Sequence, residues 1–325
     1  MSPDVDLLVI GAGPAGLSAG QYGARAGLKT LVLEKTAPGG QALLIDRLEN
    51  YPGWGAGGEA LSGFDFIQNL QTQMADFGAS LLNEEAVAIK KDGSLFRVTL
   101  AGGAEKTAAA VILATGALRR TLGVPGEARY TGRGVSYCAT CDGPFFRRKK
   151  VFVIGGGDAA CDEAWFLARL ASKVVVVHRR DRFRAQRALA ERVLCHPAIE
   201  VRFNTILREI KGDDDAVSSV VLERLPVTPT ESEPLVYEDD GAAVFIFAGT
   251  EPQSGLAPDA AKDEAGYLRT GARMETSLPG LFAAGDLRAG AFRQVVTACA
   301  DGAAAAHYAA AWIDAQRGAA YGAPA

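Results

Sequence analysis

The sequence predicts an α/β fold with two Rossmann-like, three-layer ββα dinucleotide-binding domains, the second inserted in the first. Two observations lead to this prediction. The first is that a strand, a Gly-rich turn, a helix and a second strand occur around residues 11–16 and again around residues 155–160. The second is that the last strand ends in Gly285-Asp286, which suits the first unit. We therefore expect a discontinuous domain, residues 1–116 and 248–325, and an insert, residues 117–247.

Composition sets the broad limits. Of 325 residues, 48% are hydrophobic and 22% charged, which is enough for about two domains to bury a core each. A net charge of -4 disfavours nucleic acid as a partner. No apolar run reaches the roughly 18 residues of a membrane helix, and the N-terminus lacks the basic region of a signal peptide. We expect a cytoplasmic protein with no membrane partner.

The first unit begins with a strand at residues 7–10 that leads into Gly11-Ala12-Gly13-Pro14-Ala15-Gly16. A helical pattern follows, and the next strand, residues 30–33, ends at Glu34. The glycines allow a tight turn and a close approach to a pyrophosphate at the helix N-terminus, and the acid accepts hydrogen bonds from a ribose. A tight turn in an ordinary α/β unit is the alternative. The flanking strands and the acid favour a dinucleotide site.

The next elements follow from periodicity and turn residues. Residues 39–41 and 49–53 form loops, and residues 62–78 form an amphipathic helix. Residues 86–100 form a hairpin. Residues 109–114 form a buried strand, which ends in Ala114-Thr115-Gly116.

A Cys-x-x-Cys motif, Cys138-Ala139-Thr140-Cys141-Asp142-Gly143, opens the insert. Such a pair closes a small reversible disulfide ring, and its thiols are readily tuned to a low pKa. The alternative is half of a structural zinc site, but the chain has no second Cys-x-x-Cys, and its histidines show no ligand spacing. Redox chemistry is therefore favoured over a metal site.

Four basic residues, 147–150, follow soon after the motif. A run of this kind is most simply a solvated face, with a docking surface for an acidic partner as the alternative.

The second unit repeats the first with an informative difference. A strand at residues 151–154 leads into Gly155-Gly156-Gly157-Asp158-Ala159-Ala160, followed by a helix at about residues 162–171 and a strand at residues 173–177. In the place of Glu34 stands His178, followed by Arg179, Arg180 and Arg184. Guanidinium groups bind a 2′-phosphate, whereas an acid favours an unmodified ribose. The first unit thus suits FAD or NAD and the second NADP, unless the arginines are only a surface patch.

The remaining chain returns to the first domain. Several strands are expected between residues 200 and 247, and a strand at residues 280–286 ends in the Gly-Asp turn. Arg293-Gln294-Val295 then opens a long Ala-rich helix that reaches about residue 317. Its N-terminus carries partial positive charge and could face an electron-rich ring.

With these motifs assembled, the chain resembles the bacterial-type, low-molecular-weight NADPH-dependent thioredoxin reductases. The resemblance covers nearly the whole chain and rests on the two Gly-rich turns, the Cys-x-x-Cys-Asp motif, the arginine cluster, the Gly-Asp turn and the loops at residues 39–41 and 49–53. It implies a homodimer in which hydride passes from NADPH to FAD and electrons then reach a Cys138–Cys141 disulfide. The dithiol reduces thioredoxin, with Cys138 attacking the partner, Cys141 nearer the flavin, and Asp142 as acid/base.

The resemblance also implies the cofactor-binding residues. Those for FAD are Gly11, Gly13, Pro14, Ala15, Gly16, Glu34, Gly40, Gln41, Asn50, Ala114, Thr115, Gly116, Gly285, Asp286, Arg293, Gln294 and Val295. Those for NADPH are Gly155, Gly157, Asp158, Ala159, His178, Arg179, Arg180 and Arg184.

Three other functions fit part of the sequence. The disulfide substrate could be a peroxiredoxin or a small molecule, since docking surfaces are not motifs. A dithiol oxidase or a ferredoxin-linked relative would need no 2′-phosphate site, so the arginines disfavour both. A flavin-binding redox sensor would show no multiple turnover with NADPH.

Overall fold

We describe a computed structural model of the chain over residues 2–45, 48, 50–54, 62–226 and 234–318. The chain divides into two compact units, Met1–Leu118 together with Glu251–Ala325, and Arg119–Thr250. It crosses between the units twice, in β7 (Ala117–Arg119) and β16 (Thr250–Pro252), and these two short strands pair with each other. The crossings lie within three residues of the expected boundaries at 116–117 and 247–248.

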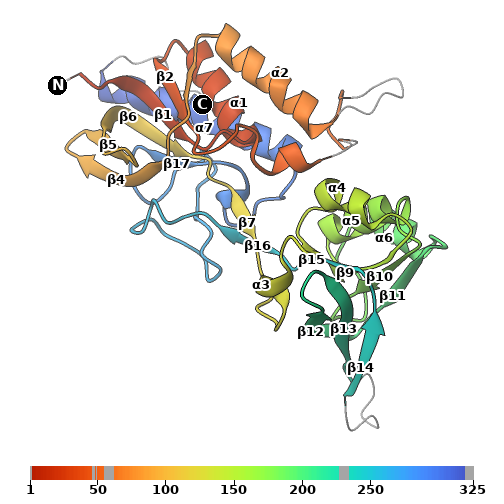
Figure 1. Cartoon of the computed structure of the whole chain (residues 1–325). Helices are drawn as coiled ribbons and strands as arrows, with labels where there is room; N and C mark the ends of the chain where they lie inside the picture. The colour runs from red at the N-terminus through yellow and green to blue at the C-terminus, as the bar shows by residue number, and fades with distance from the viewer. Residues whose placement is uncertain (1, 46–47, 49, 55–61, 227–233, 319–325) are drawn as a thin grey trace. The chain divides into compact units, whose positions relative to one another are not determined.

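The first unit is built on a mixed sheet of seven strands (Figure 1). Its strands are β1 (Val5–Ile10), β2 (Thr30–Leu33), β3 (Ser80–Leu82), β4 (Ala86–Asp92), β5 (Leu95–Leu100), β6 (Glu105–Leu113) and β17 (Leu281–Ala283). The order β3-β2-β1-β6 is parallel, and β17 extends it by pairing with the carboxyl end of β6. The amino end of β6 pairs instead with the antiparallel hairpin β4–β5. The last strand of the chain therefore completes the first sheet.

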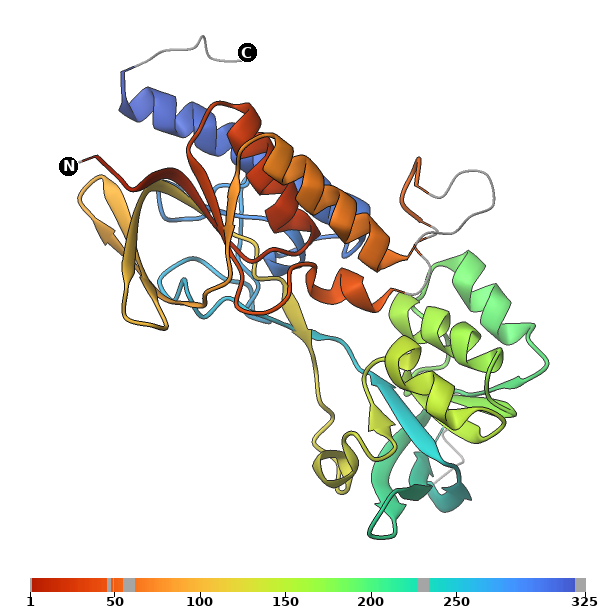
Figure 2. The same ribbon diagram turned by 45° about the horizontal axis from the view of Figure 1, so that its top comes forward.

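Alternate residues of the central strands face two different cores, because side chains in a strand point to opposite faces in turn. Leu7 and Val9 pack against helices α1 (Pro14–Arg25), α2 (Gly63–Asp76) and α7 (Val295–Gln316), whereas Leu8 and Ile10 pack toward the β4–β5 hairpin side. Helices α1 and α7 lie side by side on the sheet in both views (Figures 1 and 2).

The second unit has three layers, as expected. Its central sheet is parallel, in the order β11-β10-β9-β15-β8. These strands are β8 (Val135–Ser136), β9 (Lys150–Gly155), β10 (Lys173–Val177), β11 (Ile199–Arg202) and β15 (Ala243–Phe247). Helices α4 (Ala139–Asp142), α5 (Asp158–Ala168) and α6 (Arg187–Leu194) cover one face (Figure 1). The other face packs on an antiparallel sheet of β12 (Thr205–Gly212), β13 (Val217–Arg224) and β14 (Leu235–Asp240).

Most predicted elements are confirmed, but the helix of the second unit was placed wrongly. It begins at Asp158, directly after the glycines, and not near residue 162. Gly157 is its N-cap in an extended conformation, so no connecting residues separate the turn from the helix. Helix α6 and the short helix α3 (Glu127–Tyr130) were not predicted, because neither carries a long apolar stripe.

Among the described residues, no helix is both long and apolar enough to cross a membrane.

Candidate functional site

The Gly-rich turn of the first unit packs tightly on one side and is open on the other. A Cβ atom on Gly11, whose φ is +101°, would lie 2.4 Å from the carbonyl oxygen of Ala114, and one on Gly16 would lie 1.7 Å from that of Gly11. A Cβ on Gly13 would meet no atom within 4 Å. Pro14 and Ala15 begin α1 directly after this open point, so the helix N-terminus is accessible to an anion.

Glu34 follows β2 and points back to this turn. One of its carboxylate oxygens, Oε2, accepts a hydrogen bond from the Ala12 N–H at 2.8 Å. The other, Oε1, accepts from the Thr36 N–H at 3.0 Å and from the Thr36 hydroxyl at 3.1 Å. The acid is thus held at the edge of the turn, where a ribose acceptor is expected.

Two further predicted segments reach the same region. Gly40 lies against the turn, since a Cβ on it would be 3.5 Å from the Cα of Gly13. The Gln41 side-chain amide donates to the carbonyl oxygen of Ala117. The hydroxyl of Thr115 donates to the carbonyl oxygen of Gln253 at 2.7 Å and ties the end of β6 to the returning chain.

The N-terminus of α7 brings distant residues together. Gln294 is its N-cap and Val295 its first residue. The side-chain amide of Asn50 donates to Oε1 of Gln294 at 2.8 Å. The Arg293 guanidinium lies over the Tyr267 ring, 4.3 Å from its centroid.

In the Gly-Asp turn, Gly285 is buried next to α1 and Asp286 is half-buried. Gly285 has a φ of +75°, and a Cβ on it would lie 2.9 Å from the Cβ of Ala15. Burial raises the pKa of Asp286, and Arg293 only partly offsets this effect. The Gly285 N–H donates to Asp301 at 3.2 Å.

Asp301 also forms a 2.6 Å ion pair with Arg288. This pair was not predicted from the sequence, because its members lie on either side of the start of α7 and share no motif.

In the second unit, the turn is packed against His178. A Cβ on Gly155 would lie 2.5 Å from the carbonyl oxygen of Phe247, and one on Gly156 would lie 2.4 Å from the His178 ring. Gly157 has no atom within 4 Å of a Cβ position, so this turn is also open outward. Asp158 and the exposed Ala159 are the first two residues of α5.

His178 lies beneath the turn, whereas the arginines after it are exposed. The His178 side chain is 5% exposed, and burial, followed by the nearby Arg184, lowers its pKa. Its Nε2 atom has no hydrogen-bond partner among the described residues. Arg179, Arg180 and Arg184 form no ion pair with any described residue. Three arginines in the loop after β10 are therefore available for a phosphate.

Cys138 is disulfide-bonded and half-buried. The Cys138 N–H donates to the Ser136 hydroxyl at 3.0 Å, and the Asp142 N–H donates to the Cys138 carbonyl oxygen at 3.2 Å, which begins the short helix α4. The backbone of Cys141 lies in α4, while its side chain is outside the described part of the structure.

Cys161, Cys195 and Cys299 are free thiols. Burial raises the pKa values of Cys161 and Cys299 to about 12. Neither therefore supplies a thiolate near neutral pH.

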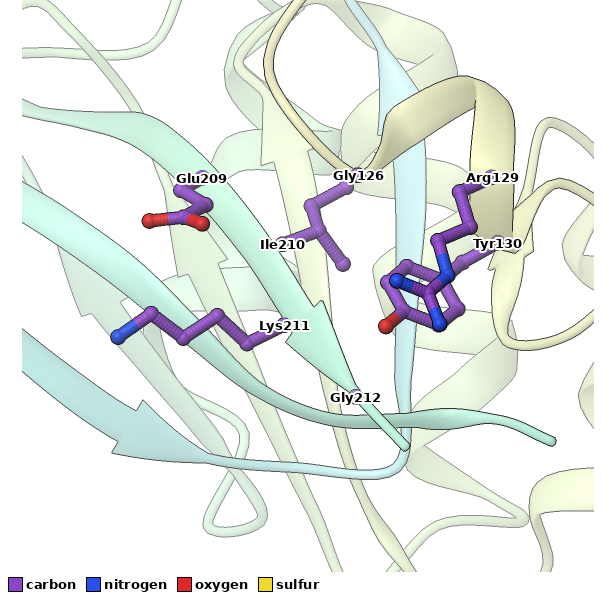
Figure 3. A pocket seen from close by; sticks show the side chains of 7 residues that line it. All are labelled: Gly126, Arg129, Tyr130, Glu209, Ile210, Lys211 and Gly212. Atoms are coloured by element: carbon purple, nitrogen blue, oxygen red, sulfur yellow. The ribbon is translucent and has the colours of Figure 1, made fainter. Parts of the chain in front are cut away.

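A separate hollow of about 310 Å³ in the second unit lies between α3 and β12 (Figure 3). Its two basic side chains are already paired: Arg129 with Asp214 at 3.1 Å, and Lys211 with Glu238 at 2.7 Å. None of the residues that line this hollow was predicted as a site residue.

Comparison with known proteins shows the family of the chain. Residues 5–302 match the family described as pyridine nucleotide-disulphide oxidoreductase. A thioredoxin reductase of Treponema pallidum (strain Nichols) is 54% identical over 314 residues, covering 97% of this chain and 99% of that protein. One from Peptoclostridium acidaminophilum is 44% identical over 312 residues, covering 95% and 97%.

A solved structure has the same fold over almost its full length. The crystal structure of Lactococcus lactis thioredoxin reductase (FR conformation) superimposes with a TM-score of 0.89 at 38% identity, covering 95% of this chain and 99% of that one. The chain therefore belongs to the pyridine nucleotide-disulphide oxidoreductase family, among its bacterial-type thioredoxin reductases.

Proposed function

We propose that the chain is an NADPH-dependent thioredoxin-disulfide reductase with FAD in the first unit and NADPH in the second. The observation that carries this proposal is the disulfide-bonded Cys138, within a Cys-x-x-Cys-Asp motif, in the same unit as three arginines without ion pairs to any described residue. A disulfide of this kind is an electron acceptor, and an arginine cluster after the second strand is suited to NADPH as the donor.

The residues of the first unit fit FAD. The open side of Gly13 and the N-terminus of α1 suit its pyrophosphate, and the carboxylate of Glu34 suits a ribose. Asn50, Gln294 and Asp286 would hold the remainder of the molecule. When bound, FAD supplies a ring that accepts a hydride and passes two electrons on to a disulfide.

The residues of the second unit fit NADPH. Gly157 leaves room beside the N-terminus of α5 for a pyrophosphate. Arg179, Arg180 and Arg184 would bind the 2′-phosphate by charge-assisted hydrogen bonds, which NADH cannot form.

The reduced cysteine pair then carries out thiol–disulfide exchange. The Cys138 thiolate attacks one sulfur of the thioredoxin disulfide, whose S–S bond breaks, and a mixed disulfide forms while one thioredoxin thiolate leaves. The Cys141 thiolate attacks the Cys138 sulfur, which releases the second thioredoxin thiolate and restores the disulfide of the enzyme. Asp142, directly after Cys141, would give and take the protons of these thiols. Two electrons pass from the dithiol to thioredoxin.

The decisive experiment is NADPH oxidation by the FAD-loaded protein, with and without an oxidised thioredoxin from the same source. Rapid multiple turnover only with thioredoxin supports the proposal in full. If NADPH bleaches the flavin but thioredoxin does not start turnover, NADPH is the electron donor and the assignment of thioredoxin as the substrate is wrong. A flavin that stays oxidised in NADPH overturns the assignment of the second unit.

The same proposal includes a homodimer and a cytoplasmic location, both in keeping with the family. Light scattering of the FAD-loaded protein tests the first, since a mass near the 34.0 kDa of one chain would contradict a dimer. Cell fractionation tests the second.

A further inference from the structure

Asp158 makes two hydrogen bonds to one residue of the loop that carries the arginines. Its Oδ1 atom accepts from the Gln186 N–H at 2.7 Å, and its Oδ2 atom accepts from the Gln186 side-chain amide at 2.9 Å. The first residue of α5 is thereby joined to the residue that precedes α6. We call these two bonds the Asp158–Gln186 clamp.

Two other contacts hold the same loop against the Gly-rich turn. The Arg184 N–H donates to the Gly156 carbonyl oxygen at 2.7 Å. The Phe183 ring stacks on His178, with ring centroids 6.0 Å apart and an interplanar angle of 30°, and it also contacts Phe203 at 5.0 Å. The backbone from His178 to Gln186 is therefore anchored at its start, in its middle and at its end.

This anchoring matters because the arginine side chains themselves are exposed and lack ion pairs with described residues. An arginine loses side-chain entropy when it is ordered on a ligand. A mobile loop backbone would add a further ordering cost when the phosphate binds. Holding the backbone in place beforehand removes that second cost.

The clamp also explains how the Asp158 carboxylate is tolerated close to the expected pyrophosphate site. A carboxylate at the N-terminus of α5 stands where the pyrophosphate is expected, and like charges repel. With both oxygens accepting from Gln186, the Asp158 carboxylate is directed toward the arginine loop.

We propose that the Asp158–Gln186 clamp positions the arginine loop and thereby determines the preference for NADPH over NADH. Asp158 and Gln186 are positioning residues on this account, and Asp158 acts through the loop, not as a direct ligand of NADPH. The inference rests on the proposed function, since it needs a 2′-phosphate bound by the arginines.

Three variants separate the geometry of the clamp from its charge. Gln186→Leu removes the side-chain donor without changing charge. Gln186→Glu places two carboxylates together and breaks the clamp. Asp158→Asn combined with Gln186→Glu restores both bonds: the introduced amide donates to the new carboxylate, which reverses the side-chain bond, and the amide oxygen still accepts from the backbone N–H of residue 186. Arg187→Ala is a matched control, since this neighbouring arginine is paired with Glu191 on α6.

The measurement is the dissociation constant of NADP⁺ and of NAD⁺ for the FAD-loaded protein by calorimetry, with hydrogen exchange of residues 178–187 in the nucleotide-free state. We expect Gln186→Leu and Gln186→Glu to weaken NADP⁺ by about fivefold or more relative to NAD⁺, which corresponds to about 1 kcal/mol. Exchange at the Arg184 amide should become faster in both. The double variant should recover both the preference for NADP⁺ over NAD⁺ and the slow exchange of the Arg184 amide.

The outcomes distinguish the clamp from the proposed function. If the unmodified protein binds NADP⁺ no better than NAD⁺, the 2′-phosphate site is wrong. If it prefers NADP⁺ and Gln186→Leu keeps that preference, the clamp is wrong. If Gln186→Glu loses the preference for NADP⁺ and Gln186→Leu keeps it, the cause is charge repulsion, and the clamp is again wrong.

Discussion

The side-chain amide of Asn50 donates a hydrogen bond to Gln294 at 2.8 Å, although the two residues are 244 positions apart. Gln294 is at the same time the N-cap of α7. The bond therefore connects an early loop to the start of the last helix, two elements of the first unit. It joins two segments that we propose bind the same FAD molecule.

Replacing Cys138 by serine should stop turnover and leave the earlier electron transfer intact. Serine cannot form a mixed disulfide, so thioredoxin-dependent NADPH oxidation should fall to background. NADPH should still bleach the flavin, which absorbance measures directly. Cys195→Ser removes an exposed free thiol and should keep full turnover. Continued thioredoxin reduction by the Cys138 variant would refute the role of this cysteine.

Replacing Arg179 by alanine should weaken NADPH binding much more than NADH binding. A hydrogen bond to a charged group contributes about 1.5–3 kcal/mol, so we expect KM for NADPH to rise roughly 10- to 100-fold. Steady-state kinetics with both donors tests this. Arg187→Ala, which removes an exposed arginine paired with Glu191, should change neither KM by more than about twofold. Equal losses for the two donors in Arg179→Ala would remove the 2′-phosphate argument.

Replacing Asp286 by asparagine should stabilise the FAD-free protein at neutral pH. Burial raises the pKa of Asp286 above its ordinary value of 3.8. A group whose pKa is higher in the folded state than in the unfolded state stabilises the fold at pH values below its unfolded-state pKa. This contribution is lost as the pH rises through its folded-state pKa. Asparagine does not titrate and has no such loss. The free energy of unfolding of the variant, relative to that of the unmodified protein, should therefore increase from about pH 4 to pH 7.

Denaturant unfolding of the FAD-free protein at several pH values measures this difference. Asp259→Asn is the control, because Asp259 is exposed in the same unit. Parallel pH profiles for Asp286→Asn and the unmodified protein would contradict the prediction.

Replacing Gly302 by alanine should force α1 and α7 apart. A Cβ on Gly302 would lie 2.0 Å from the carbonyl oxygen of Ala15, and that backbone is buried. Overpacking of this kind costs about 1–3 kcal/mol, more than the helix propensity that alanine adds. Thermal unfolding should show a lower Tm, whereas Gly102→Ala, which meets no atom within 4 Å, should leave it unchanged. A Tm equal to that of the unmodified protein would show that the helices shift freely.

Local patterns explain why much of the fold was predictable. The strands at Thr30–Leu33 and Lys173–Val177 were predicted at their observed bounds, because short apolar runs between turn residues define them. The start of α5 was predicted too late, because Asp158 reads as part of the turn until Gly157 is known to be its N-cap. Helix α6 escaped prediction since Val193 is its only fully buried residue.

The sequence by itself determined the two dinucleotide units, the redox cysteine motif and the contrast between Glu34 and the arginines after His178. These signals depend on residues close together in the chain, whose spacing sets the turn and the chemistry. The tertiary structure alone decided which distant side chains meet, namely Asn50 with Gln294, Arg288 with Asp301, and Asp158 with Gln186. Such pairs depend on how separate elements pack, and no local propensity or spacing encodes that.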